Sequence, residues 1–285
     1  MNNLTFTRKE RKYLIIEHSF DEITKDLEKH IPVYSFEGEK PYTNIETTYM
    51  DTKDFLLFNE YLNRRNFRFK IRLRRYGHNG KAEGDYLVEL KVKHNSISIK
   101  RRFFLPEKLY NDFLSGVNLK SEIKAANKGL VGAMKTYKLI SKLIASNSFI
   151  PVLKTSYERL SFQKKSNKIR ITVDWKIVHQ KLCGKKKTTT LDAVILESKI
   201  SGKTPKWHKK MVNKLSLLKQ NRFSKFATGI NSVYFPNRGK YNFYDDTEDG
   251  LSEVPEPIST SFELLQKPLN LTEKIAENTE EVINE

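Results

Sequence analysis

Residues 67 to 77 read FRFKIRLRRYG, and their alternation restricts the folds open to this chain. Four apolar side chains, from Phe67 to Leu73, alternate with four basic ones, from Arg68 to Arg74. Successive residues of a β-strand point to opposite faces of its sheet. The segment is therefore predicted to form a strand with one apolar face and one cationic face.

The same two-sided pattern returns in other segments. In YLVELKVKH, Glu89 and Lys91 share a face, in NKIRITVDW Arg170 shares one with Asp174, and in DAVILESKI Glu197 shares one with Lys199. The opposite faces of these segments are apolar. By this criterion strands are predicted near residues 9–17, 45–50, 67–76, 85–94, 97–105, 152–163, 168–179 and 189–200.

Helical spacing separates these strands. Helices are expected at 20–30 and 206–219, a helical insertion at 107–150, a short helix or turn after Asp51, and a helical piece at 223–235. About eight antiparallel strands indicate a closed or nearly closed barrel. The predicted fold class is α+β: an antiparallel β-barrel tunnel of about eight strands, with a basic interior and with helices packed on its apolar outside.

Charge divides the chain into two parts. The net charge is +18, and residues 240–285 hold 12 Asp and Glu against 3 Lys, a net −9, which leaves +27 on residues 1–239. We predict a tunnel domain over 1–239 and an acidic, disordered tail over 240–285. So basic a body implies a polyanionic partner.

Other function classes lose support from the composition. The single cysteine, Cys183, excludes an internal disulfide, and the six histidines show no zinc-ligand spacing. No run approaches the ~20 apolar residues of a membrane helix, and the first residues do not resemble a signal peptide. We expect a cytoplasmic protein without a membrane span.

A cationic interior needs counter-charge, because an unpaired charge in a low-dielectric cavity costs many kcal/mol. Glu89 and Glu197 are too few to neutralise the basic residues of the strands, so the expected occupant is a triphosphate or a polyphosphate chain. A carboxylate among so many cations is a reasonable ligand for Mg²⁺ or Mn²⁺, which prefer oxygen. Glu197 is the first choice for this metal site.

These segments together resemble a known family, the VTC-type polyphosphate polymerase domain of the triphosphate tunnel metalloenzyme superfamily. The matching motifs run in order over roughly residues 5 to 235: ERKYLI, TTYMDT, KIRLRRYG, VELKVKH, ISIKRRF, TSYERLSF, IRITVDW, VILESKI and RFSKFATG. The resemblance implies an antiparallel β-tunnel that transfers the γ-phosphate of ATP to a growing polyphosphate chain. The resemblance does not determine whether a membrane partner accepts the product.

The resemblance also implies site residues. Phosphate contacts are expected from Lys12, Arg72, Arg74, Lys91, Lys100, Arg159 and Arg170, with Tyr157 nearby. Glu197 falls on the family's metal-binding glutamate, and Lys199 follows on the same face. Lys225 falls on a lysine that reaches the phosphates from the C-terminal helix, together with Ser224; Arg222 is a further candidate. Arg72, Arg74, Arg159, Arg170 and Lys225 are assigned to catalysis.

Two alternatives are kept. One is a tripolyphosphatase of the same superfamily, since the same tunnel can deliver phosphate to water. The other is a non-enzymatic binder of polyanions or nucleic acid, which would carry its basic residues on an exposed stripe with stacking aromatics. No nucleic-acid partner is expected, because the basic positions share faces with Glu89, Asp174 and Glu197.

Other segments are given simpler interpretations. SGKTPK at 201–206 is not a P-loop, because the first glycine of that motif would fall on Glu197. KLCGKKKTTT at 181–190 is expected to be a solvated hairpin turn, and Tyr137 and Phe149 are expected in the core. For the acidic tail, a second hypothesis is that it folds onto the tunnel mouth and competes with the polyanion.

Overall fold

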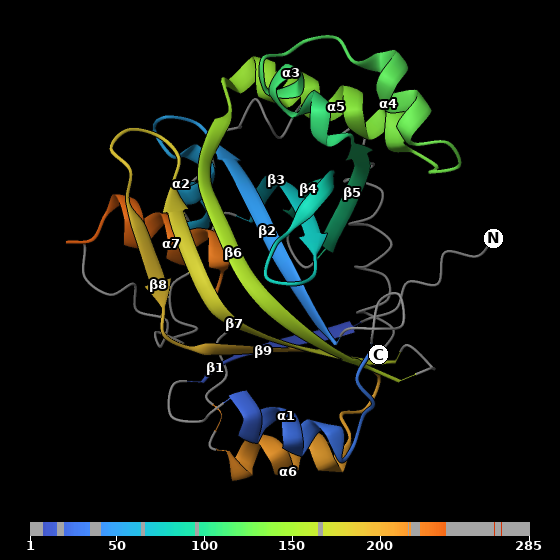
Figure 1. Cartoon of the computed structure of the whole chain (residues 1–285), viewed down its shortest axis with the longest axis vertical. Coiled ribbons are helices and arrows are strands. Elements are labelled where there is room, and N and C mark those ends of the chain that lie inside the picture. Colours follow the sequence, from blue (N-terminus) through green and yellow to red (C-terminus); the bar gives the residue numbers. More distant parts are fainter. Residues whose placement is uncertain are drawn as a thin grey trace.

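The computed structural model describes residues 8–15, 20–34, 41–63, 66–94, 97–164, 168–215, 217, 223–237, 265 and 269. One antiparallel sheet organises this part of the chain (Figure 1). Its strands are β1 (Arg8–Ile15), β2 (Tyr42–Asp51), β3 (Phe67–Gly77), β4 (Glu83–His94), β5 (Ile97–Leu105), β6 (Ile150–Gln163), β7 (Ile169–Lys181), β8 (Thr188–Leu191) and β9 (Val194–Ser201). Their order is β1-β9-β7-β6-β2-β3-β4-β5, and β8 pairs with β7 alone.

Helices lie between and after the strands. They are α1 (Phe20–Glu28), α2 (Leu56–Leu62), α3 (Tyr110–Leu114), α4 (Lys120–Ala126), α5 (Ala133–Asn147), α6 (Lys206–Lys214) and α7 (Lys225–Tyr234), with a 3₁₀ turn at Glu107–Leu109. The start of α7 has a local cause, because the Ser224 hydroxyl caps its first turn by accepting from the amide of Ala227. Within the described residues, no helix is long and apolar enough to cross a membrane.

The apolar faces of the strands lie outside, under helices, as the alternation predicts. Ile71 and Leu73 of β3 are fully buried, in a cluster that also holds Ile140 and Leu143 of α5. A second cluster joins the outer faces of β1, β7 and β9 to α1 and α6. Figure 1 shows these two groups of helices at opposite ends of the molecule, α3–α5 over β5 and α1 with α6 beyond β1 and β9.

Tyr137 and Phe149 belong to the first cluster, which confirms their expected place in the core. Leu265 and Leu269, from the segment predicted to be a disordered tail, are buried in the same cluster. The rest of 240–285 lies outside the described residues, as does Arg222.

One detail of the strand prediction needs correction. The segment predicted as one strand over 189–200 is two, because β8 ends at Leu191 and β9 starts at Val194, which gives nine strands. Residues 182–187 connect β7 to β8 as a hairpin, as expected.

Of the closed or nearly closed barrel that the sequence predicts, the structure has the open form: within the described residues, β1 and β5 do not pair. Part of the reason is local. Asn127, which directly follows α4, accepts from the amide of Phe104 (2.7 Å) and donates to its carbonyl (2.8 Å), so it occupies backbone groups that a closing strand would need on β5.

Candidate functional site

The register of the sheet places the predicted site residues on one continuous face. Directly paired residues in antiparallel strands share a face. The pairs include Lys12 with Glu197, Arg170 with Lys199, Arg159 with Asp174, Arg72 with Glu89 and Lys91 with Lys100. We call this surface the cationic face; it lies opposite the face that packs on α1, α6 and α3–α5.

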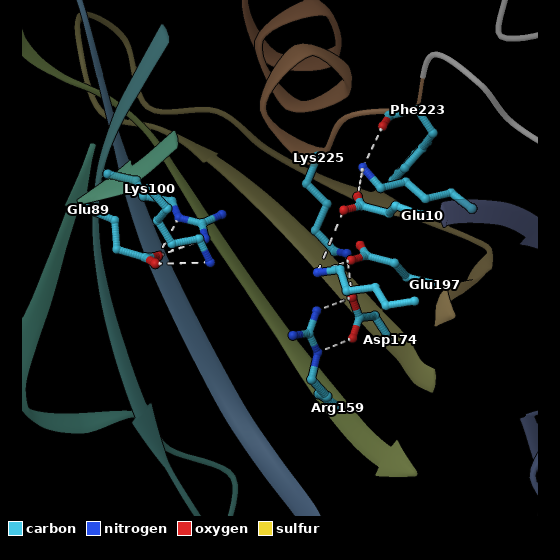
Figure 2. Close-up of polar contacts among 11 residues, drawn as sticks. Glu10, Glu89, Lys100, Arg159, Asp174, Glu197, Phe223 and Lys225 are labelled. Atoms are coloured by element: carbon cyan, nitrogen blue, oxygen red, sulfur yellow. Dashed lines mark hydrogen bonds and ion pairs between the residues drawn. The ribbon is translucent and has the colours of Figure 1, made fainter. Parts of the chain in front are cut away.

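The cationic face curls so that its two ends approach each other. Lys12 and Lys199 belong to strands β1 and β9, at the far end of the strand order from β4. The pKa of Lys91 on β4 is nevertheless lowered to about 8, mainly by desolvation and also by the charges of Lys12 and Lys199. Glu10 partly opposes this effect. Figure 2 shows the two groups of side chains as facing walls, with Glu89 and Lys100 on one and Arg159, Asp174 and Glu197 on the other.

Residues 223–225 bridge these walls at the start of α7. The Phe223 carbonyl accepts from Lys12 of β1 at 3.2 Å, and the Ser224 hydroxyl accepts from Lys70 of β3 at 2.8 Å. The third residue, Lys225, donates to Asp174 of β7 at 2.5 Å. The start of α7 is thereby held inside the curl of the sheet, and Lys225 lies among the residues of the cationic face.

One buried carboxylate organises the wall formed by β3, β4 and β5. Glu89, 2% exposed, accepts from Arg72 Nε at 2.7 Å and makes an ion pair with Lys100 Nζ at 3.5 Å. Desolvation would raise the pKa of Glu89, but Arg72, Arg74 and Lys100 outweigh it and lower the pKa to about 2. Glu89 therefore stays ionised and fixes the Arg72 guanidinium.

Arg74 of β3 and Tyr157 of β6 lie close enough on the cationic face for the charge of Arg74 to act on the tyrosine hydroxyl. Arg74 is buried and donates to Thr47 Oγ1 at 3.1 Å. The Tyr157 ring lies 5.4 Å from Arg159 Cζ and 4.7 Å from Lys225 Nζ. Desolvation would raise the pKa of the Tyr157 hydroxyl, but Arg74, Arg159 and Lys225 lower it below its ordinary value. Tyr157 is thus surrounded by three of the cations assigned to catalysis.

Glu197 lies on the opposite wall among lysines. Its Oε1 is 2.7 Å from Lys199 Nζ. Desolvation would raise the pKa of Glu197, but Lys12, Lys199 and Arg159 outweigh it and hold the pKa well below its ordinary value. Glu10, which the sequence reasoning did not single out, is 3.8 Å from Lys199 and 3.6 Å from Lys12. Glu197 is thus an ionised carboxylate among cations, and carboxylate oxygens are the ligands that hard divalent metals prefer.

The donor set around Glu197 fits a metal that completes its shell with substrate. No group of three or more His, Cys, Asp or Glu suited to a metal occurs among the residues that the structure describes. Mg²⁺ in particular binds through one or two carboxylates plus phosphate oxygens and water, not through a full protein cage. Glu197 suits that mode.

Arg170 lies nearer the rim of this site, where it is exposed. Desolvation and the neighbouring Arg159 lower the pKa of its guanidinium. Lys70 was missed as a site residue, although the opening alternation already places it on the cationic face. Desolvation, then Lys12 and Lys91, lower the pKa of Lys70 well below its ordinary value. The signal that finds Lys70 is its spacing of two from Arg72.

The fold and site together define a class: an open, curled antiparallel sheet whose inner face presents opposed cations with buried carboxylates. Residues 7–234 match the VTC domain model. The chain belongs to the VTC domain family, which confirms the resemblance seen in its motifs.

Individual relatives are distant. The chain is 23% identical over 274 residues to the vacuolar transporter chaperone complex subunit 4 of Schizosaccharomyces pombe, covering 81% of this chain and 38% of that protein. It is 25% identical over 279 residues to subunit 4 of Trypanosoma cruzi, covering 80% and 34%. The chain thus spans about a third of the length of these curated relatives.

Among solved structures, a putative adenylate cyclase from Bacillus halodurans aligns with 80% of this chain and 97% of its own, at a TM-score of 0.45 and 13% identity. A putative adenylyl cyclase from Hippeastrum aligns with 81% and 98%, at a TM-score of 0.40 and 12% identity.

Proposed function

We propose that this chain is a polyphosphate polymerase domain that transfers the γ-phosphate of ATP onto a growing polyphosphate chain. The observation that carries the proposal is the pair of opposed cationic walls, in which buried carboxylates hold Arg72 and Arg159 in place. Membership of the VTC family, with relatives that are subunits of a vacuolar transporter chaperone complex, supports the same activity. Partner subunits, a membrane partner among them, and a cytoplasmic location are part of the proposal.

The walls would act by positioning and by neutralising charge. Phosphoryl transfer needs in-line geometry and stabilisation of charge on the transferring group more than covalent participation by the protein. Arg72 and Arg74 from one wall would hold one side of the transferring phosphate, and Arg159 the other, with Arg170 at the rim. Because Arg72, Arg74 and Arg159 are already held by Glu89, Thr47 and Asp174 respectively, their guanidiniums need little reorganisation when phosphate binds.

Glu197 would hold the divalent cation, Mn²⁺ or Mg²⁺. When bound, such an ion polarises phosphate oxygens and neutralises their charge. Lys12, Lys91, Lys100 and Lys199 lie on the same cationic face and would contact the phosphates of the chain. The terminal phosphate of that chain is the nucleophile, so no protein nucleophile is required, and ADP leaves.

The test is incubation of the purified chain with ATP and Mn²⁺, followed by a gel stained for polyphosphate. Glu197→Gln should abolish synthesis while the fold is kept. The matched control is Glu158→Gln, which changes a carboxylate of β6 on the opposite face, paired at 3.0 Å with the exposed Lys176. Full synthesis by Glu197→Gln would refute the metal assignment, and release of free phosphate without polymer would favour the tripolyphosphatase.

A further inference from the structure

Asp174 is the most completely buried charged group of the cationic face. It lies on β7 opposite Arg159 of β6, and its side chain has no solvent exposure. An ionised carboxylate without solvent must have its oxygens satisfied by the protein. The groups that donate to the Asp174 oxygens therefore indicate what this residue does.

Three donors satisfy the two oxygens. Arg159 Nε donates to Oδ1 at 2.5 Å and the Arg159 terminal nitrogen donates to Oδ2 at 2.8 Å, while Lys225 Nζ donates to Oδ2 at 2.5 Å. The two-point contact fixes the plane of the guanidinium as well as its distance. In Figure 2 the remaining guanidinium nitrogen points away from Asp174, toward the side where Glu89 and Lys100 lie.

The same carboxylate joins three elements. Arg159 comes from β6, Asp174 from β7 and Lys225 from the first turn of α7. Desolvation alone would raise the pKa of Asp174, but Arg159 and Lys225 lower it. Loss of its charge would leave both cations without their ion-pair partner beside the Tyr157 ring.

Other chemical roles fit Asp174 poorly. A general base or a metal ligand needs an oxygen that substrate or solvent can reach. Both oxygens of Asp174 are engaged by cations and neither is exposed. A metal ion would have to displace an arginine and a lysine to bind there.

We propose that Asp174 is a positioning residue, which aims Arg159 and Lys225 at one phosphate group of the substrate and anchors the start of α7 to the tunnel wall. The inference rests on the proposed function for its substrate, a triphosphate or polyphosphate chain. Asp174 itself would not touch the phosphate.

Simple charge counting and positioning predict opposite results for Asp174→Asn. Removing a negative charge makes the tunnel more attractive to an anion, so charge alone predicts tighter binding of inorganic tripolyphosphate. If Arg159 and Lys225 are instead misplaced in the variant, tripolyphosphate should bind about tenfold more weakly and kcat for synthesis should fall about 100-fold. Small misplacements of catalytic groups have effects of that size. The sign of the change in affinity separates the two.

The experiment is calorimetric titration of the full chain with tripolyphosphate for wild type, Asp174→Asn, Asp174→Glu and the control Glu158→Gln. Asp174→Glu keeps the charge but moves the carboxylate by one methylene, so it also should bind more weakly; it serves as the second variant if Asp174→Asn does not fold. Acetylation of Lys225, followed by mass spectrometry, gives a readout without ligand and should be faster in both Asp174 variants than in wild type or Glu158→Gln.

The outcomes divide clearly. Equal or tighter binding in the Asp174 variants, or unchanged acetylation of Lys225, would overturn the positioning role while the proposed function stands. Failure of the wild-type chain to bind tripolyphosphate would instead overturn the proposed function, and with it the phosphate that Asp174 is said to serve.

Discussion

Replacement of Glu89 by glutamine should destabilise the folded chain by an amount that depends on pH. Glu89 is almost fully buried, and its cationic neighbours lower its pKa from 4.5 to about 2. At 1.36 kcal/mol per pKa unit, this depression corresponds to about 3 kcal/mol of folding free energy at pH 7. Glutamine keeps the shape of the side chain but not the charge, so most of this stabilisation should be lost.

The direction of the pH dependence follows from the lowered pKa of Glu89. The folded state holds the ionised form more tightly than the unfolded state does, so the stabilisation is fully present above pH 4.5. It is lost as the pH falls toward 2, with roughly half remaining at pH 3. The difference between wild type and Glu89→Gln should therefore shrink between pH 7 and pH 3.

Urea unfolding at pH 7 and at pH 3, followed by circular dichroism, measures this difference. Glu158→Gln is the matched control, since its pair with Lys176 is at the surface and should contribute less than about 1 kcal/mol. A Glu89→Gln variant as stable as wild type at pH 7, or a deficit that is the same at both pH values, would refute the reasoning.

Two further predictions concern α7 and the acidic segment. Gly229→Ala should destabilise the chain by about 1–2 kcal/mol despite the better helix propensity of alanine, because the new Cβ would lie 2.6 Å from His179 Nδ1 and from Leu153 Cδ2. Urea unfolding measures this change, and a variant as stable as wild type would contradict the prediction. Replacement of the Asp and Glu between 245 and 256 by Asn and Gln should lower the KM for ATP at low salt if that segment competes with polyanion, and an unchanged KM would count against competition. Charge replacement is a better test than truncation at 240, which would also remove the buried Leu265 and Leu269.

Much of the fold could be predicted from local pattern. The period of two in residues 67–77 places Arg72 and Arg74 on one face and Ile71 and Leu73 on the other, whatever the rest of the chain does. Combined with several other strands of the same kind, and with helices that need an apolar surface, it also indicates which face is inside. The helix boundaries near 20 and 206 followed in the same way from local spacing.

The sequence alone determined, then, that strands with one cationic and one apolar face alternate with helices, and its motifs gave the family. Only the tertiary structure decided which carboxylate meets which cation. Lys225 is 51 residues from Asp174, and Lys12 is 211 residues from the Phe223 carbonyl that it contacts. Such pairs depend on strand order, register and the curl of the sheet, and a local period carries no information about them. The same holds for the open edge between β1 and β5, where the backbone of β5 is bonded by Asn127, a residue that follows α4 and lies 23 positions beyond Phe104.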